Sequence, residues 1–267
     1  MCLIIFLYDM HPRYRLILAA NRDEDYNRPT APLCFWDDDP GILAGRDLKH
    51  NGMWLGVSRT GRIAAITNFR EPGFRMANAP SRGFLVGDFL VSDQSPEHYM
   101  EHVKSMGHKF NGFNLFVGNR SELFYYSNRG NSIQKIKPGL YGVSNRFLDT
   151  PWPKVIRGKA GIKKLIDNTN KIDAEDIFDV LKDSACPPDN VLPDTGVGLT
   201  WERILSPLFI TSKFYGTRSS SIVLMERSDR ITFLERTFIP DGAVSREEKT
   251  RKFSFDIISN GKVDKKS

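Results

Sequence analysis

Two apolar runs open the chain and give its clearest pattern. Residues 2–9 and 14–20 are almost wholly hydrophobic, and Pro12 lies in the short polar gap between them. Because proline in such a gap favours a turn, the two runs predict a β-hairpin. The second run then changes abruptly into the polar stretch 21–25, Asn-Arg-Asp-Glu-Asp. Charged groups at the end of a buried strand either meet solvent at the rim or belong to a site.

The rest of the chain alternates groups of strands with pairs of helices. The spacing of apolar positions predicts helices at 83–91, 96–106, 154–168 and 174–183. It predicts further strands at 53–58, 62–68, 112–117, 122–127, 132–136, 140–144, 207–210, 219–225, 231–236 and 251–257. The segment between Cys186 and Trp201 is rich in proline and glycine, and we interpret it as a mobile flap over a pocket.

This order of elements predicts the fold class. Strands do not alternate singly with helices, and no glycine-rich phosphate loop follows a strand, which argues against a doubly wound nucleotide-binding fold. Mostly antiparallel strands interrupted by two helical pairs favour a layered α+β sandwich. We expect one domain over residues 1–258, followed by a basic, disordered tail over residues 259–267.

The net charge of +6 bears on the class of partner. Much of it lies near the carboxyl end and on the stretch 154–171, which is typical of a frayed tail and a solvated helix face. No nucleic-acid-binding motif accompanies this charge, so we expect no nucleic-acid partner. A small anionic ligand and peripheral contact with membrane headgroups are compatible with it.

Cysteine usage and the length of the apolar runs indicate the compartment. Cys2, Cys34 and Cys186 are scattered along the chain, which fits a reducing compartment better than a disulfide framework. No apolar run approaches the roughly 20 residues that cross a bilayer. From the cysteines and the short apolar runs we expect a cytoplasmic protein. The sequence contains no metal-ligand spacing, so we expect no metal site.

Cys2 is the strongest candidate for chemistry. Removal of the initiator methionine would leave a thiol and a free α-amine on one residue. An α-amine titrates at about 7.7–8.0, so it can act as a base toward its own thiol near neutral pH. The alternative is that Cys2 is only a small buried hydrophobic residue in the first strand.

The polar stretch after the second run is the next candidate. If residues 2–9 and 14–20 pair as a hairpin, position 21 falls close to Cys2. An arginine–carboxylate set there could lower the pKa of the thiol, orient the α-ammonium group or bind a ligand carboxylate. The alternative is a solvated turn with weak ion pairs at the rim.

Three other polar residues stand at the ends of predicted strands. Asn68 and Asn145 carry side-chain amides suited to stabilising an oxyanion, and Arg218 could supply a fixed cation. Turn chemistry alone is the alternative for each, because such residues favour strand ends.

Several separated motifs resemble one family. They are Ala20-Asn-Arg-Asp-Glu24, Asn111-Gly-Phe-Asn-Leu115, Gly142-Val-Ser-Asn145 with Thr150-Pro-Trp-Pro-Lys154, and Tyr215-Gly-Thr-Arg218. In this order, over residues 2 to about 257, they are similar to the NRDE-motif family, also called the transport and Golgi organisation protein 2 family. That family is similar to the N-terminal-nucleophile hydrolases, which implies a four-layer αββα sandwich.

The resemblance also implies roles for the candidate residues. Cys2 would be the nucleophile, Arg22 and Asp23 its companions, Asn145 an oxyanion donor and Arg218 a late arginine. Asn21, Glu24 and Asn68 would contact the ligand, with Asn68 as a further amide donor. The related hydrolases space their arginine and aspartate three apart, which would select Asp25 in place of Asp23.

Two functions follow from the resemblance. The family implies intracellular haem trafficking, with haem as cargo, together with a role in lipid homeostasis and an association with mitochondria or the Golgi. The five histidines, Cys2 and Cys186 are the candidate axial ligands. The alternative is a cysteine amidohydrolase or thioesterase that acts on an acyl lipid or acyl-CoA-type substrate and needs no catalytic cofactor. A non-catalytic scaffold is a third hypothesis.

Overall fold

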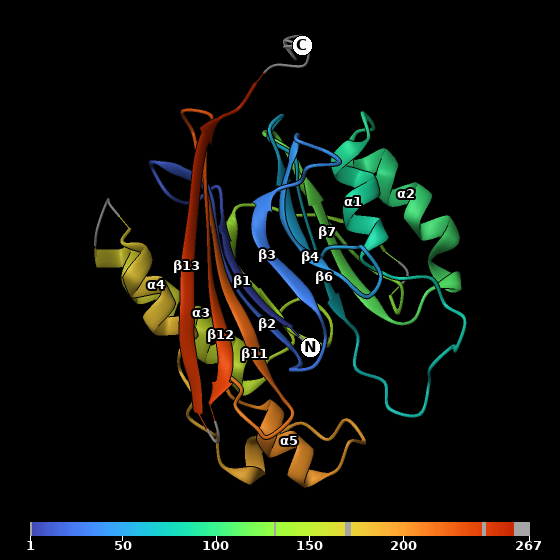
Figure 1. Cartoon of the computed structure of the whole chain (residues 1–267), viewed down its shortest axis with the longest axis vertical. Coiled ribbons are helices and arrows are strands. Elements are labelled where there is room, and N and C mark those ends of the chain that lie inside the picture. Colours follow the sequence, from blue (N-terminus) through green and yellow to red (C-terminus); the bar gives the residue numbers. More distant parts are fainter. Residues whose placement is uncertain (1, 131, 169–171, 242–243, 259–267) are drawn as a thin grey trace.

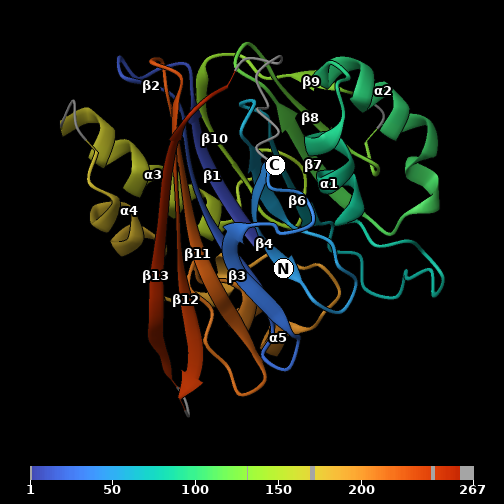
Figure 2. The same cartoon turned by 45° about the horizontal axis from the view of Figure 1, so that its top comes forward.

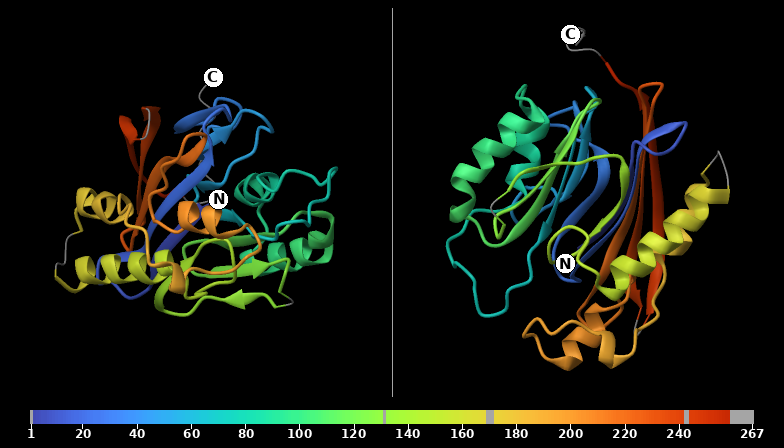
Figure 3. Two further views of the ribbon diagram at one scale, coloured as in Figure 1. Left: turned by 90° about the horizontal axis from the view of Figure 1, so that it is seen from below. Right: turned by 180° about the vertical axis from the view of Figure 1, so that it is seen from behind.

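Two antiparallel sheets lie face to face, and each carries helices on its outer side (Figures 1 and 2). The computed structural model describes residues 2–130, 132–168, 172–241 and 244–258, so the predicted tail lies outside the described residues. The first sheet has the order β10-β1-β2-β11-β12-β13 and the second the order β3-β4-β5-β6-β7-β8-β9. Helices α3 and α4 cover the first sheet, and α1 and α2 cover the second (Figure 3). The predicted four-layer α+β sandwich is confirmed.

The elements have the following bounds. The first sheet contains β1 (Cys2–Tyr8), β2 (Tyr14–Asp25), β10 (Gly139–Val143), β11 (Tyr215–Glu226), β12 (Arg230–Asp241) and β13 (Val244–Asp256). The second contains β3 (Thr30–Phe35), β4 (Ile42–Asp47), β5 (Leu55–Ser58), β6 (Ile63–Asn68), β7 (Phe113–Gly118), β8 (Leu123–Ser127) and β9 (Gln134–Lys135). The helices are α1 (Phe84–Val91), α2 (Pro96–Met106), α3 (Pro153–Asn168), α4 (Ala174–Leu181) and α5 (Leu199–Leu205), with short 3₁₀ turns at Gly107–Lys109 and Asp189–Val191.

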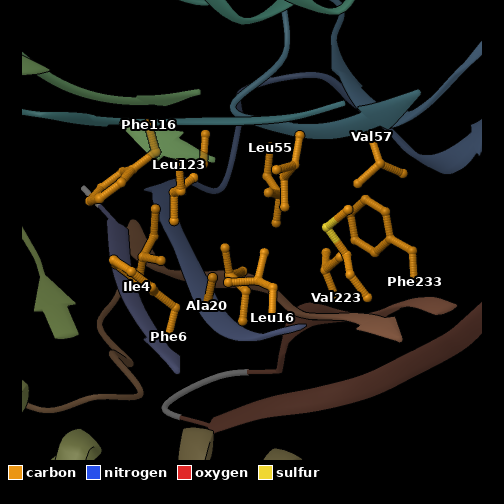
Figure 4. Packing of buried hydrophobic residues seen from close by; sticks show 14 of the residues in the cluster. Ile4, Phe6, Leu16, Ala20, Leu55, Val57, Phe116, Leu123, Val223 and Phe233 are labelled. Carbon is orange, nitrogen blue, oxygen red and sulfur yellow. The ribbon is translucent and has the colours of Figure 1, made fainter. Parts of the chain in front are cut away.

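Strand β1 is apolar along its whole length because both of its faces are buried. Side chains alternate between the two faces of a strand, and both faces of this sheet are covered. Leu3 and Ile5 pack with α3 and α4, whereas Ile4 and Phe6 pack against the second sheet. Figure 4 shows Ile4 and Phe6 in this inter-sheet core, opposite Phe116 of β7. The core between the sheets therefore fixes the position of β1.

The structure corrects the sequence-based elements in three places. Strands β3 and β4 were missed; Pro32 weakens the strand signal of β3, and it is tolerated because β3 is an edge strand. The predicted strand 207–210 is a buried bend in which Phe209 N–H donates to Asp183 O and Ile210 N–H donates to Thr217 Oγ1. The segment 132–136 contributes only the two residues of β9 to a strand.

The segment between Cys186 and Trp201 is also different from the prediction. It contains a 3₁₀ turn and leads into helix α5, which lies at the lower end of the first sheet in Figure 1. Thr195 bonds to the Glu202 carboxylate through its backbone N–H at 2.8 Å and also through its hydroxyl. This segment is therefore anchored to α5, and it does not line the cleft described below.

Candidate functional site

The β1–β2 hairpin places Cys2 beside the polar stretch. Cys2 pairs with Arg22 and Leu3 pairs with Asn21, which confirms the predicted register. Cys2 follows the alternation of Ile4 and Phe6, so it continues their face of the sheet toward the space between the two sheets. The apolar core between the sheets thus ends at Cys2 of β1 and Arg22 of β2, which carry a thiol and a guanidinium.

A cleft of about 790 Å³ lies at this end of the sandwich. Its lining includes the residues Cys2, Arg22, Asp23 and Glu24. Asn68 and Asn145 also line it, and so does the segment 69–75, which follows β6. The segment after β6 is drawn in teal at the lower right of Figure 1, where it extends away from the sheets. A volume of this size is typical of a small-molecule site.

A hydrogen bond to its backbone carbonyl oxygen helps to fix Cys2 in the wall of the cleft. Cys2 is 9% exposed, and Ser144 Oγ donates a hydrogen bond to its carbonyl oxygen at 3.1 Å. Burial raises the pKa of the Cys2 thiol above its ordinary value, and the nearby Arg22 charge acts in the opposite direction. The thiol therefore rests in its protonated form at neutral pH, and a nucleophilic attack would require a base.

Asp23 is the aspartate that the structure brings to the cleft. Its carboxylate is buried, accepts a hydrogen bond from Thr217 Oγ1 at 2.8 Å and lines the same cavity as Cys2. Burial raises the pKa of Asp23, and the nearby ammonium of Lys154 lowers it in part. Asp25 is exposed and accepts from Asn27 N–H in the following turn. Of the two aspartates, Asp23 is therefore the one that lines the cleft.

The two asparagines predicted as amide donors meet at the cleft. Asn145 is fully buried, and its Nδ2 donates to the Asn68 carbonyl oxygen at 2.9 Å, while its Oδ1 lies 3.1 Å from Ser144 Oγ. An amide nitrogen has two N–H bonds, so one remains for a ligand. Asn145 and Asn68 both line the cavity, as expected for candidate donors.

Asn21 lies on the other face of the sheet, under the helices. Its Nδ2 donates to the carbonyl oxygens of Leu181 and Leu208, both at 2.9 Å, and its Oδ1 accepts from Ser220 Oγ at 2.6 Å. The period of two explains this, because Asn21 is one position out of phase with Arg22. Asn21 therefore supports the bend at 207–210 and does not line the cleft.

Arg218 is also turned away from the cleft. Thr217 pairs with Asp23 and Ser219 pairs with Arg22, so Arg218 is the extra residue of a β-bulge. Its Nη1 donates to three carbonyl oxygens of the turn after β2, at Asp25, Tyr26 and Arg28, over 3.0–3.1 Å. The late arginine thus closes the turn after β2 and lines a smaller cavity that adjoins the cleft, with Arg22 in the wall of both.

Lys154 is a buried charge next to the site that sequence reasoning did not single out. The residue is 2% exposed, and its Nζ has no hydrogen-bond partner within the described part of the chain. Burial lowers the pKa of Lys154 to about 8, and the charges of Asp23 and Cys2 raise it in part. A signal existed, since Lys154, Gly158 and Ile162 recur every fourth residue on the face of α3 that meets the sheet.

A buried ion pair links the wall of the cleft to helix α5. Arg70 lines the cleft and binds Glu202 of α5 at 2.8 Å, with its guanidinium over the Trp152 ring at 4.7 Å. Glu24 lies in the wall between two arginines, 3.9 Å from Arg22 and 3.8 Å from Arg28. Charged side chains of both signs therefore surround the thiol.

The described residues contain neither a cluster of metal ligands nor a membrane-spanning helix. Within the described ranges, no group of three or more histidine, cysteine, aspartate or glutamate side chains could hold a metal ion. None of the helices in these ranges has the length and apolar character of a membrane span.

Comparison with known structures identifies the class of fold. A mutant of the conjugated bile acid hydrolase from Clostridium perfringens superposes with a TM-score of 0.51 over 96% of this chain and 97% of that chain, at 11% sequence identity. The sandwich is that of the N-terminal-nucleophile hydrolases.

Sequence comparison then gives the family. The Transport and Golgi organisation 2 family matches residues 1–240, and the chain belongs to this family. The bovine Transport and Golgi organization protein 2 homolog is 35% identical over 95% of this chain and 99% of its own length. The human homolog is 34% identical with the same coverage of both chains.

Proposed function

We propose that this chain is a cysteine amidohydrolase or thioesterase that acts on an acyl compound, with Cys2 as its nucleophile. The observation that carries the proposal is the position of the Cys2 thiol in the wall of a ligand-sized cleft, paired across the sheet with Arg22. Asp23 and Asn145 line the same cleft. Acyl transfer needs a nucleophile, a base and donors for an oxyanion, and these residues can supply all three once the α-amine of Cys2 is free.

The proposed reaction starts with loss of Met1, which frees the Cys2 α-amine. This amine takes the thiol proton as the sulfur attacks the acyl carbon, so a C–S bond forms and the carbonyl oxygen becomes an oxyanion. The amide of Asn145 would donate to that oxygen. Collapse breaks the C–N or C–S bond of the substrate, and the α-ammonium protonates the leaving group. Water then hydrolyses the acyl-cysteine thioester and returns the thiol.

Asp23 and Arg22 would act on the groups that change charge. The buried Asp23 carboxylate can stabilise the α-ammonium that forms during attack. The Arg22 guanidinium lowers the pKa of the thiol and offsets part of the effect of burial. The charge of Lys154 favours the ionised form of Asp23 and offsets part of the rise in its pKa that burial causes.

Hydrolysis of acyl probes tests the proposal. We expect purified protein to cleave an octanoyl thioester or an N-octanoyl amide, and the Cys2→Ser variant to lose at least about 100-fold in kcat/KM. The matched control is Cys186→Ser, which changes an exposed thiol outside the cleft. Intact mass must show that Met1 is absent from the active protein. Equal activity of the wild type and the Cys2→Ser variant would refute the proposal.

Haem binding, and with it a role in haem trafficking, is the second candidate function. One observation favours it: His50 and Cys2 line the same cleft as the guanidinium of Arg22. Imidazole and thiolate are axial ligands of haem iron, and a guanidinium suits a propionate. Of the predicted axial ligands, Cys186 and the other four histidines do not line this cleft.

A haem titration separates the two functions. Saturable binding with a shifted Soret band, weakened by His50→Ala and by Cys2→Ala, would support the carrier. His98→Ala is the matched control, because His98 lies on α2 outside the cleft. If neither substitution changes the titration, the haem is not bound in the cleft.

A further inference from the structure

The arginines around the cleft fall into two groups. Four of the guanidiniums that line it already have a carboxylate within 4.0 Å. These pairs are Arg22–Glu24, Arg28–Asp47, Arg46–Asp38 and Arg70–Glu202. Arg75 and Arg82 also line the cleft, and neither has a carboxylate partner within that distance among the described residues. Two positive charges in the cleft wall are therefore not neutralised by the protein.

Arg82 is held in place although its charge is not paired. Its Nη1 donates to the Gly112 carbonyl oxygen at 2.8 Å, and Gly112 N–H donates to the Glu71 carboxylate at 3.1 Å. One carbonyl uses only one of the five N–H donors of a guanidinium. The remaining donors are available to a ligand in the cavity.

The backbone beside Arg82 is packed too tightly to move freely. A Cβ on Gly83 would lie 2.9 Å from the Met53 carbonyl oxygen, and a Cβ on Gly52 would lie 3.0 Å from the Gly83 backbone. Only glycine allows these two segments to approach so closely. Helix α1 begins directly after Gly83, so Arg82 is positioned by a rigid element on one side and a backbone contact on the other.

The electrostatics around Arg82 favour an anion. Burial is the largest cause that lowers the Arg82 pKa, and the nearby charges of Arg75 and Arg28 lower it further, whereas Cys2 and Glu24 raise it in part. Glu24 acts in the other direction, but it is already shared by Arg22 and Arg28. A carboxylate or phosphate would relieve the repulsion and could bond to two guanidinium nitrogens at once.

We infer that Arg82, assisted by Arg75, forms a subsite for an anionic group of the ligand, while the ligand's carbonyl lies at Cys2. The ligand class is an acyl compound that carries a carboxylate or a phosphate in the same molecule. This assignment rests on the proposed function for the position of the carbonyl. The anion subsite itself rests only on the unpaired guanidiniums of the cleft wall.

Binding of matched probes tests the subsite. Titration calorimetry on the full chain with Cys2→Ala, which removes the proposed nucleophile, would compare N-octanoylglycine with its neutral amide, N-octanoylglycinamide. We expect the carboxylate to bind at least about tenfold more tightly than the amide. N-octanoyl-O-phosphoethanolamine is the phosphate probe, and the tighter of the two anions identifies the natural headgroup chemistry.

The substitutions then locate the effect. Arg82→Gln should weaken binding of the carboxylate about tenfold and leave the neutral amide within about twofold. Arg82→Lys should restore part of the loss, because it keeps the charge but not the two-nitrogen contact. Arg46→Gln is the matched control, since its guanidinium is paired with Asp38 and stacked on Trp36. We expect it to bind both probes within about twofold of the parent protein.

The outcomes separate the subsite from the function. Equal binding of the carboxylate and amide probes, or full binding by Arg82→Gln, would overturn the subsite even if both probes are hydrolysed by the wild type. Selective binding without any hydrolysis would uphold the subsite and overturn the proposed catalysis. If Arg82→Gln does not fold, the Arg82→Lys variant and the comparison of probes on the parent protein still decide the question.

Discussion

The space between the two sheets has two ends that differ in kind. At one, Ile4 and Phe6 of β1 pack with apolar side chains of the second sheet (Figure 4). At the other, the same strand ends in Cys2, opposite Arg22, at the wall of a polar cleft. Both ends are built by one hairpin, so the packing of the apolar end fixes the position of Cys2 at the other end. The difference predicts that substitutions at one end change stability, and that substitutions at the other change chemistry.

Phe6→Ala should produce the largest loss of stability. Phe6 is 1% exposed and its ring contacts Phe116 and Tyr141, with centroids 5.2 and 5.3 Å apart. Removing a buried aromatic ring costs about 3–5 kcal/mol in free energy of unfolding. Chemical denaturation would measure the loss. A change below about 1 kcal/mol would mean that the apolar end does not support the hairpin.

Lys154→Met should alter how stability depends on pH. The pKa of Lys154 is lowered to about 8 in the folded chain, against 10.5 as its ordinary value. The unfolded chain therefore holds this proton more tightly, so the buried charge costs stability below pH 8. That cost disappears as the pH rises toward 10.5, and a change of this size corresponds to about 3 kcal/mol.

The measurement is the free energy of unfolding of wild type and Lys154→Met across this pH range. We expect the free energy of unfolding of the wild type to rise, relative to that of the variant, by up to about 3 kcal/mol from pH 8 to 10.5. Lys159→Met is the control, because Lys159 lies on the same helix and is paired with Asp149 near the surface. Parallel pH profiles for wild type and Lys154→Met would contradict the burial of an unpaired ammonium.

Asn21→Ala should have an intermediate effect on stability and little effect on the cleft. The substitution removes three buried hydrogen bonds and leaves the carbonyl oxygens of Leu181 and Leu208 without that donor. We expect a loss of about 2 kcal/mol with probe binding unchanged. Loss of probe binding in a variant that is still folded would return Asn21 to the site.

Cys2→Ala should have the smallest effect on stability and the largest on chemistry. The side chain faces the cleft and makes no hydrogen bond to any of the described residues, so truncation should cost less than about 1 kcal/mol. A loss as large as that of Phe6→Ala would make Cys2 a core residue, which is the alternative reading of its position.

The sequence predicts the apolar end of this comparison better than the polar end. The unbroken runs of β1 and β2, with Pro12 between them, were enough to predict a hairpin that brings Cys2 beside Arg22. Helices α2 and α3 follow from their apolar spacing to within a residue. By contrast, β3 was missed because it contains Pro32. Proline is tolerated on the edge strand of a sheet, but the sequence does not show that β3 is an edge strand.

The site was harder to predict because a shift of one residue in strand register changes which side chains face the cleft. A β-bulge at Arg218 turns that side chain out of the cleft, and bulges leave no clear mark in one sequence. Arg82 and Arg75 lie in the segment between β6 and α1, where no periodicity applies. Their importance depends on which other arginines are already paired, and only the three-dimensional structure gives that information.

Cys2 is the group of the cleft that we propose to react with an acyl compound. The most direct test is to incubate the protein with an octanoyl thioester, stop the reaction rapidly and map the octanoyl adduct by peptide mass spectrometry. We expect the acyl group on Cys2 of the chain that lacks Met1, and we expect Asn145→Ala to slow its formation. Acylation confined to the exposed Cys186, or no adduct on Cys2 under conditions in which the probe is consumed, would contradict it.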